Sequence, residues 1–148
     1  MLSKITVRIL DDWTTLMAGI EKPDNIKYMC ITGSVEGGTT TFLAFSNKQY
    51  EPLFAVKVFR YVDDEERISN EIDILSCLSN CGSTISNSIP RLILSEKFSG
   101  VWILVQSIMQ GQPMKAIITD KGLPSLSHAD HNFEIASSWL ENLYHSTK

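Results

Sequence analysis

Residues 54–59 have the sequence FAVKVF, in which a lysine stands in the middle of an apolar, β-branched run typical of a buried strand. An unpaired ammonium costs several kcal/mol to bury, so we expect an anion to meet Lys57. Side chains alternate between the two faces of a strand, which places Ala55 on the same face as Lys57. The alternative is an edge strand whose lysine reaches out to water, because the valines on the other face already supply a core.

The flanking sequence offers two kinds of partner for this lysine. Upstream lies a glycine turn whose backbone N–H groups and hydroxyls could hold phosphate. Its candidate contacts are Gly33, Ser34, Gly37, Gly38 and Thr39. Downstream, a helical pattern over residues 62–80 carries Glu71 on the same broad face as its apolar residues, so Glu71 can point back toward the sheet. The simpler explanations are an ordinary hairpin turn and a solvated helix carboxylate.

The glycine turn is not a Walker A loop, although its spacing is similar. Thr39 stands where the phosphate-binding lysine of that loop belongs. A Walker A loop also opens into a helix, whereas residues 40–46 are strand-like. The turn therefore lies between two strands of a hairpin.

Composition limits the class of protein. The chain has 148 residues, 43% of them hydrophobic and 20% charged, which suits one ordinary globular domain. The formal net charge is −4 and the basic residues are scattered, which argues against nucleic-acid binding. No apolar run approaches the roughly 20 residues that span a bilayer, and no signal peptide is evident. With an odd number of cysteines, 3, we expect a cytoplasmic protein with reduced thiols, no membrane partner and no metal site.

The order of elements predicts an α+β fold, a five-stranded antiparallel sheet with one packed helix and a C-terminal linker helix. The expected strands are residues 26–31, 40–46, 53–60, 91–98 and 101–109, and the expected helices are 62–80 and 128–147. Within residues 1–25, which we take as an N-terminal extension, residues 5–10 alternate like a strand and a short helical pattern follows. The last helix has an apolar stripe through Phe133 and Trp139 that nothing covers, which suggests a homodimer through this helix.

Taken in order, the glycine turn, Lys57 and Glu71 resemble the N-terminal lobe of the protein-kinase-like superfamily, closest to the aminoglycoside phosphotransferase and choline kinase-like family. Residues 103–114 (ILVQSIMQGQPM) look like the hinge of that family, and residues 139–147 (WLENLYHST) are similar to its helix ending in Leu-His-x-x-Thr, with Tyr144 as a one-residue departure. The resemblance implies a kinase-like N-lobe over residues 26–112, followed by a linker and the first C-lobe helix over 113–148.

The resemblance also implies the roles of single residues. Lys57 would hold the ATP phosphates, Glu71 would fix Lys57, and Ala55 would lie against the adenine. The backbone between Gln106 and Ile108 would meet the edge of the adenine. ATP and Mg²⁺ are the cofactors that the family uses, and a small-molecule acceptor would bind the other lobe.

The catalytic loop and the metal-binding aspartate of that family have no counterpart in this chain. We therefore expect no catalytic or metal-ligating residue here and no phosphoryl transfer by the 148 residues alone. The first hypothesis is the ATP-binding lobe of a small-molecule kinase, truncated before its catalytic loop. The alternative is a non-catalytic, pseudokinase-like binding or regulatory module, which the absence of a Gly-x-Gly-x-x-Gly motif favours.

Overall fold

The computed structural model describes residues 1–33, 38–60, 65–80, 86–109 and 126–147. In chain order the elements are α1 (Leu2–Asp11), α2 (Trp13–Leu16), β1 (Ile26–Gly33), β2 (Thr39–Ser46), β3 (Pro52–Phe59), α3 (Glu65–Ser79), β4 (Leu92–Phe98), β5 (Val101–Ser107) and α6 (Leu126–Ser146). The five strands expected for the sheet and both expected helices are present with small shifts at their ends, although residues 62–64 of the expected 62–80 helix lie outside the described residues.

The strands form one five-stranded antiparallel sheet in the order β1-β2-β3-β5-β4, which confirms the predicted α+β fold. β3 is the central strand and pairs with β2 on one side and β5 on the other. The run FAVKVF is therefore not an edge strand, and the corresponding alternative for Lys57 is wrong.

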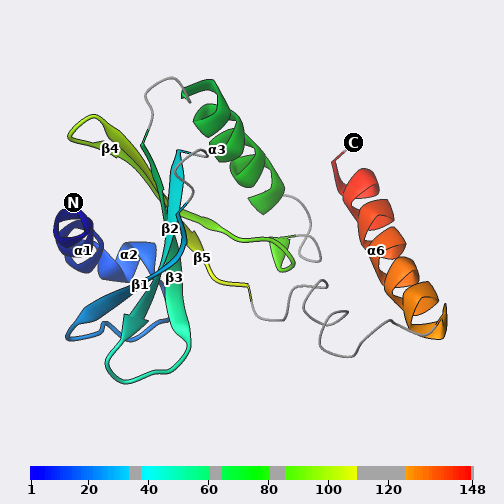
Figure 1. Cartoon of the computed structure of the whole chain (residues 1–148), viewed down its shortest axis with the longest axis horizontal. Coiled ribbons are helices and arrows are strands. Elements are labelled where there is room, and N and C mark those ends of the chain that lie inside the picture. Colours follow the sequence, from blue (N-terminus) through cyan, green and yellow to red (C-terminus); the bar gives the residue numbers. More distant parts are fainter. Residues whose placement is uncertain (34–37, 61–64, 81–85, 110–125, 148) are drawn as a thin grey trace.

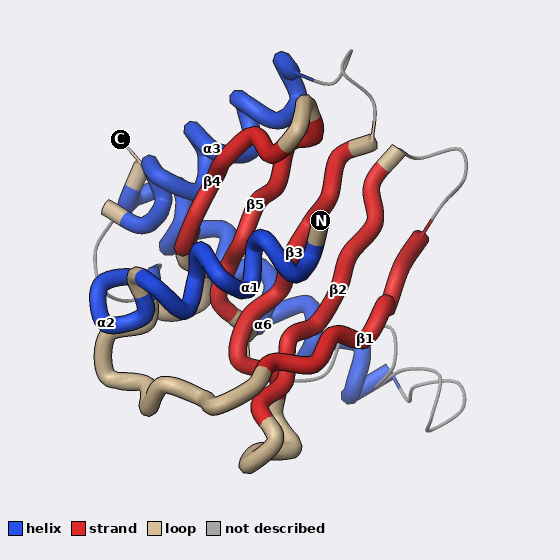
Figure 2. The backbone as a smooth tube through the Cα atoms, turned by 90° about the vertical axis from the view of Figure 1, so that its left-hand side faces the viewer, coloured by secondary structure: helices blue, strands red, loops and turns tan. Residues whose placement is uncertain are grey.

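The two faces of the sheet carry separate layers of apolar side chains. Phe54, Val56 and Val58 of β3 belong to the larger core, which α1 and α2 cover. On the opposite face Phe59 packs with Ile68 of α3, and Leu104 of β5 joins them. Figure 2 shows α1 crossing the front of the sheet with α3 behind it. The alternation within β3 thus sends the valines to one layer and Lys57 to the other.

The strand expected over residues 5–10 is wrong, because this segment is helical. Its inward side chains recur every four residues, at Ile5, Ile9, Trp13 and Met17, and all are buried in the larger core. Val7, which made the segment alternate like a strand, points outward and is 58% exposed. The segment continues without a turn signal into α2, so a helical period of about 3.6 extends across both short helices. Residues of the N-terminal extension therefore contribute to the main core.

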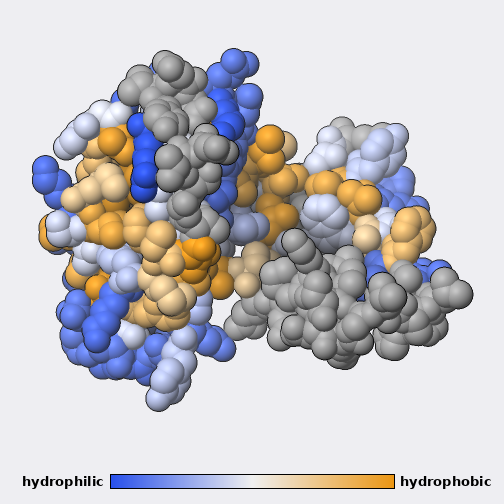
Figure 3. Space-filling model, in the orientation of Figure 1, coloured by the Kyte–Doolittle hydropathy of each residue, from blue (hydrophilic) through white to orange (hydrophobic). Residues whose placement is uncertain are grey.

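Helix α6 lies on the α3 side of the sheet (Figure 1). Trp139 Nε1 donates a hydrogen bond to Ser88 Oγ at 2.9 Å, which links the helix to the segment before β4. Phe133 is 74% exposed, and Leu140 and Tyr144 are also exposed. Figure 3 shows hydrophobic side chains on this helix, at the right of the view. Within the described ranges, no helix is long and apolar enough to cross a membrane.

Candidate functional site

Lys57 and Glu71 meet across the interface between the sheet and α3. The Lys57 ammonium donates a hydrogen bond to Glu71 Oε1 and forms an ion pair with it. Their side chains are 27% and 28% exposed, so each is partly withdrawn from water. The pairing that the sequence predicted is present, and Glu71 is not a solvated helix carboxylate.

Local sequence explains why α3 presents Glu71 to the sheet. The acidic Glu65 and Glu66 occupy the first turn, where the positive end of the helix dipole favours them. Ile68, Ile72 and Leu75 follow at helical spacing and pack onto the sheet through Phe59 and Leu104. Glu71 lies three residues after Ile68 and four before Leu75, so it shares their face.

A pocket of about 520 Å³ opens beside this ion pair, between β2, β3 and α3. Its lining residues are Thr39, Lys57, Phe59, Arg67, Asn70, Glu71, Ile74 and Leu75. It brings together three residues predicted from the sequence, Lys57, Glu71 and Thr39. It also contains two polar residues that the sequence analysis missed, Arg67 and Asn70. Arg67 precedes Glu71 by one helical turn, so the four-residue spacing was a signal that could have identified it.

Arg67 links the start of α3 to the start of β2. Its Nη2 donates a hydrogen bond to Thr39 Oγ1 at 2.6 Å. Its guanidinium carbon lies 5.7 Å from the centre of the Phe59 ring, within the range of a cation–π contact. The Arg67 charge is thereby held at the wall of the pocket that contains Lys57.

A row of mostly apolar side chains, called the apolar row below, crosses the sheet on the same face as Lys57 and passes through Ala55, two residues before Lys57 in β3. Strand pairing sets Met29 opposite Leu43, Leu43 opposite Ala55, and Ala55 opposite Gln106. Ala55 is 5% exposed, whereas Met29 is exposed and Leu43 half-buried. The row, formed by Met29, Leu43, Ala55 and Gln106, lies on the Lys57 face because two residues along a strand restore the same face. The sequence predicted Ala55 and Gln106 but missed the other two members, whose positions depend on strand register.

The segment proposed as the hinge follows directly from this row. Arg91 and Ser107 hold the end of β5 through two hydrogen bonds: Ser107 N donates to the Arg91 carbonyl at 2.9 Å, and Arg91 N donates to Ser107 Oγ at 2.8 Å. The Ile108 side chain lines two other hollows, of about 550 and 440 Å³, and not the pocket beside Lys57. The structure therefore places Gln106 beside Ala55 and leaves Ile108 at the end of the sheet.

The glycine turn is only partly within the described residues. Gly33 ends β1 opposite Thr40, and Gly38 precedes β2 with a positive φ of 63°, a conformation that glycine adopts without strain. The Gly38 carbonyl accepts a hydrogen bond from Arg60 N at 2.7 Å. The predicted contacts Ser34 and Gly37 lie outside the described residues.

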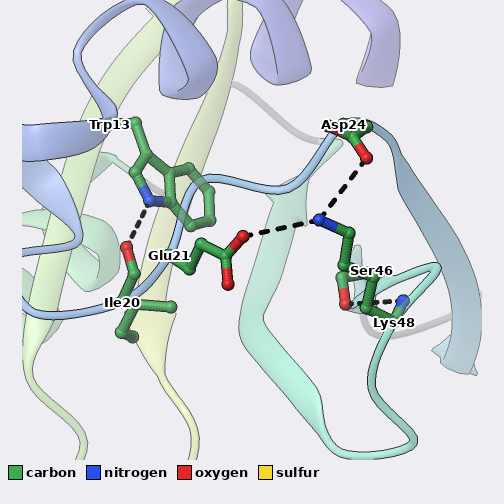
Figure 4. A network of polar contacts seen from close by, with 6 residues as sticks. All are labelled: Trp13, Ile20, Glu21, Asp24, Ser46 and Lys48. Carbon is green, nitrogen blue, oxygen red and sulfur yellow. Dashed lines mark hydrogen bonds and ion pairs between the residues drawn. The ribbon is translucent and has the colours of Figure 1, made fainter.

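Lys48 provides a contrast with Lys57. It lies in the loop between β2 and β3, at the opposite end of β3 from the pocket, and its ammonium lies 3.4 Å from Glu21 and 3.6 Å from Asp24 (Figure 4). The charge of Asp24 and the hydrogen bond to Glu21 raise the pKa of Lys48. Lys48 is an exposed surface cation with acidic neighbours. The hollow that it lines does not include Lys57.

The described part of the chain offers no cluster of three His, Cys, Asp or Glu side chains that could hold a metal ion. Mg²⁺ therefore has no fitting set of protein ligands among these residues, and we derive no step through it.

Comparison with known proteins adds no family assignment. No protein-family model matches the chain, and no curated protein matches it. The resemblance to kinases therefore stays a prediction from the sequence.

Proposed function

We propose that this chain is the ATP-binding N-terminal lobe of a small-molecule kinase of the aminoglycoside phosphotransferase or choline kinase-like kind. The observation that carries the proposal is the Lys57–Glu71 ion pair, which lines one pocket and adjoins the apolar row. A central-strand lysine with a carboxylate partner from the packed helix is the arrangement that positions an ammonium for phosphate oxygens.

The apolar row supports the nucleotide part of the proposal. Leu43 and Ala55 face the same side of the sheet as Lys57, and Gln106 ends the row next to the hinge segment. A flat apolar surface suits the face of a purine base, whereas the pocket beyond it offers cations for phosphates. Lys57 lies two residues beyond Ala55, roughly 7 Å along the strand, so one ligand could contact both.

In this function Lys57 binds phosphate oxygens and Glu71 keeps the ammonium in place between binding events. Mg²⁺, when bound to the nucleotide, would supply charge neutralisation for phosphoryl transfer. The acceptor alcohol, the residues that would activate it and the cytoplasmic location remain parts of the proposal. Association through α6 also stays a prediction, consistent with its exposed apolar side chains.

A second candidate function is a non-catalytic nucleotide-binding module. It is favoured by the lack of a Gly-x-Gly-x-x-Gly motif in the sequence. Both candidates require nucleotide binding at Lys57, so the first experiment tests what they share.

The experiment is a titration of the ¹⁵N-labelled 148-residue chain with ATP, followed by heteronuclear NMR. We expect a dissociation constant on the order of 1 mM, because a single lobe contacts the nucleotide from one side only. Amide shifts should concentrate at Leu43, Ala55 and Lys57. Lys57→Met should weaken binding at least about tenfold, the loss of one charge-assisted hydrogen bond.

Lys48→Met is the matched control, because it removes the same charge from a lysine that does not line the pocket. We expect it to bind ATP like the unaltered chain. Glu71→Gln should weaken binding less than Lys57→Met, since the lysine remains. Equal affinities of the Lys57 and Lys48 variants would show that Lys57 has a structural role only, and the kinase proposal would lose its central residue.

A further inference from the structure

The pocket beside Lys57 contains a second basic side chain, Arg67, to which the proposed function assigns no role. Arg67 reaches the pocket from α3, and Lys57 reaches it from β3. The acidic lining residue is Glu71, which already pairs with Lys57. Among the described lining residues, two basic groups from different elements, Lys57 and Arg67, thus face one pocket, an arrangement that suits an anionic ligand.

Strand register fixes where the two cations lie relative to each other. Arg67 is anchored on Thr39 and Phe59, which face each other across β2 and β3. Lys57 precedes Phe59 by two residues, so the Arg67 anchor lies roughly 7 Å further along the strand. Ala55 lies the same distance from Lys57 in the opposite direction. Apolar row, ammonium and guanidinium therefore follow one another in a line along β3.

We propose that Arg67 is a second phosphate-binding residue, which makes the pocket selective for nucleotides with several phosphates over nucleoside monophosphates. This inference rests on the proposed function, since it assumes that the base lies on the apolar row. A monophosphate held there reaches Lys57 but ends before the Arg67 anchor. A triphosphate is long enough to contact both cations.

The chemistry of the side chain suits this role. A guanidinium presents N–H donors in a planar fork that matches the oxygens of a phosphate group. Its hydrogen bond to Thr39 and its position over Phe59 restrict its rotamers before the ligand arrives, which lowers the ordering cost of binding. Lysine at this position would keep the charge but lose the fork.

The test compares ATP, AMP and inorganic tripolyphosphate, each titrated into the 148-residue chain and followed by NMR. The variants are Arg67→Gln, Arg67→Lys and the control Arg8→Gln. Arg8 belongs to α1 on the other face of the sheet, where it pairs with Asp12 and Glu96, so the control removes the same charge away from the pocket. We expect the unaltered chain to bind ATP at least about tenfold more tightly than AMP.

In Arg67→Gln the preference for ATP over AMP should nearly disappear, with AMP affinity unchanged. Arg67→Lys should retain part of the preference, and Arg8→Gln all of it. An equal loss for ATP and AMP in Arg67→Gln would mean that the residue only braces α3, and would overturn the inference. If Arg67→Gln does not fold, Arg67→Lys decides. The inference would be overturned if Arg67→Lys kept the full preference for ATP over AMP and bound tripolyphosphate as tightly as the unaltered chain.

The outcomes separate this inference from the proposed function. If Lys57→Met loses ATP binding while Arg67→Gln keeps the full ATP preference, the inference fails and the proposed function stands. If tripolyphosphate binds as tightly as ATP and loses affinity in Arg67→Gln, the role of Arg67 stands and the nucleotide proposal fails. If the unaltered chain binds none of the ligands, both are overturned.

Discussion

The Lys57–Glu71 ion pair should contribute measurably to stability, and a double-mutant cycle can isolate its contribution. At 4 Å two unit charges attract by about 4 kcal/mol at an effective dielectric constant near 20, and by about 1 kcal/mol in water. The two side chains are 27% and 28% exposed, an environment between these limits. Partial desolvation of both groups opposes the attraction. We therefore expect a coupling free energy of about 1–2 kcal/mol.

The cycle uses Lys57→Met, Glu71→Gln and the double variant, with free energies of unfolding from urea titrations monitored by far-UV circular dichroism. Lys97 of β4 and Glu65 of α3 provide a comparison pair between the sheet and the same helix, with Nζ and Oε1 2.6 Å apart but side chains 39% and 57% exposed. This pair should show a clearly smaller coupling than Lys57–Glu71, because solvent screens exposed charges.

The salt dependence of the coupling free energy should also differ between the two ion pairs. At about 1 M NaCl the screening length falls to about 3 Å, which should remove most of the Lys97–Glu65 coupling. The Lys57–Glu71 coupling should largely persist, because the pair is less accessible to ions. A Lys57–Glu71 coupling no larger than that of the exposed pair, or one abolished by salt, would refute the reasoning that burial strengthens it.

Three further predictions concern stability. Ile9→Ala should lower the free energy of unfolding by about 2–4 kcal/mol in urea titrations, because Ile9 is 0% exposed; a loss below about 1 kcal/mol would contradict its place in the core. Thr40→Val should raise it by about 1 kcal/mol, since the buried Thr40 hydroxyl has no hydrogen-bond partner within the described structure; a loss of stability would indicate an unrecognised partner. Lys97 lowers the pKa of Glu65, so that pair stabilises the fold above the unfolded-state pKa and stops doing so as pH falls through the folded-state pKa. The difference in urea midpoint between Glu65→Gln and the unaltered chain should therefore shrink from neutral pH to about pH 3, and a constant difference would contradict the pairing.

The sheet could be predicted because its strands carry strong local signals. The valines of β3 alternate with Ala55 and Lys57, and the glycine turn and Ser99–Gly100 loop separate neighbouring strands. The first helix could not be predicted as well, because a segment with Ile5, Val7 and Ile9 fits both a two-residue and a four-residue period. Only the burial of Trp13 and Met17, one and two turns later, decides between them. Short amphipathic segments remain ambiguous until their neighbours are known.

The candidate site was predictable to the extent that it depends on local spacing. Lys57 stood out because a charge in an apolar run needs a partner, and Glu71 because the packed helix turns one carboxylate toward the sheet. Met29 and Leu43 were missed because their place beside Ala55 depends on strand register, which a β-bulge between Cys30 and Thr32 shifts.

Arg67 shows how a residue that looks ordinary in sequence acquires a role from the fold. In the first turn of an acidic helix it reads as a surface cation, and the sequence offers no reason to connect it with Thr39. The packing of α3 on the sheet brings Arg67 to Thr39, and the same packing brings Glu71 to Lys57. Both charged contacts therefore depend on the packing of Ile68 against Phe59 and Leu104. A change in that small apolar cluster should therefore alter the proposed anion binding without touching any charged residue, because the position of the helix sets both contacts.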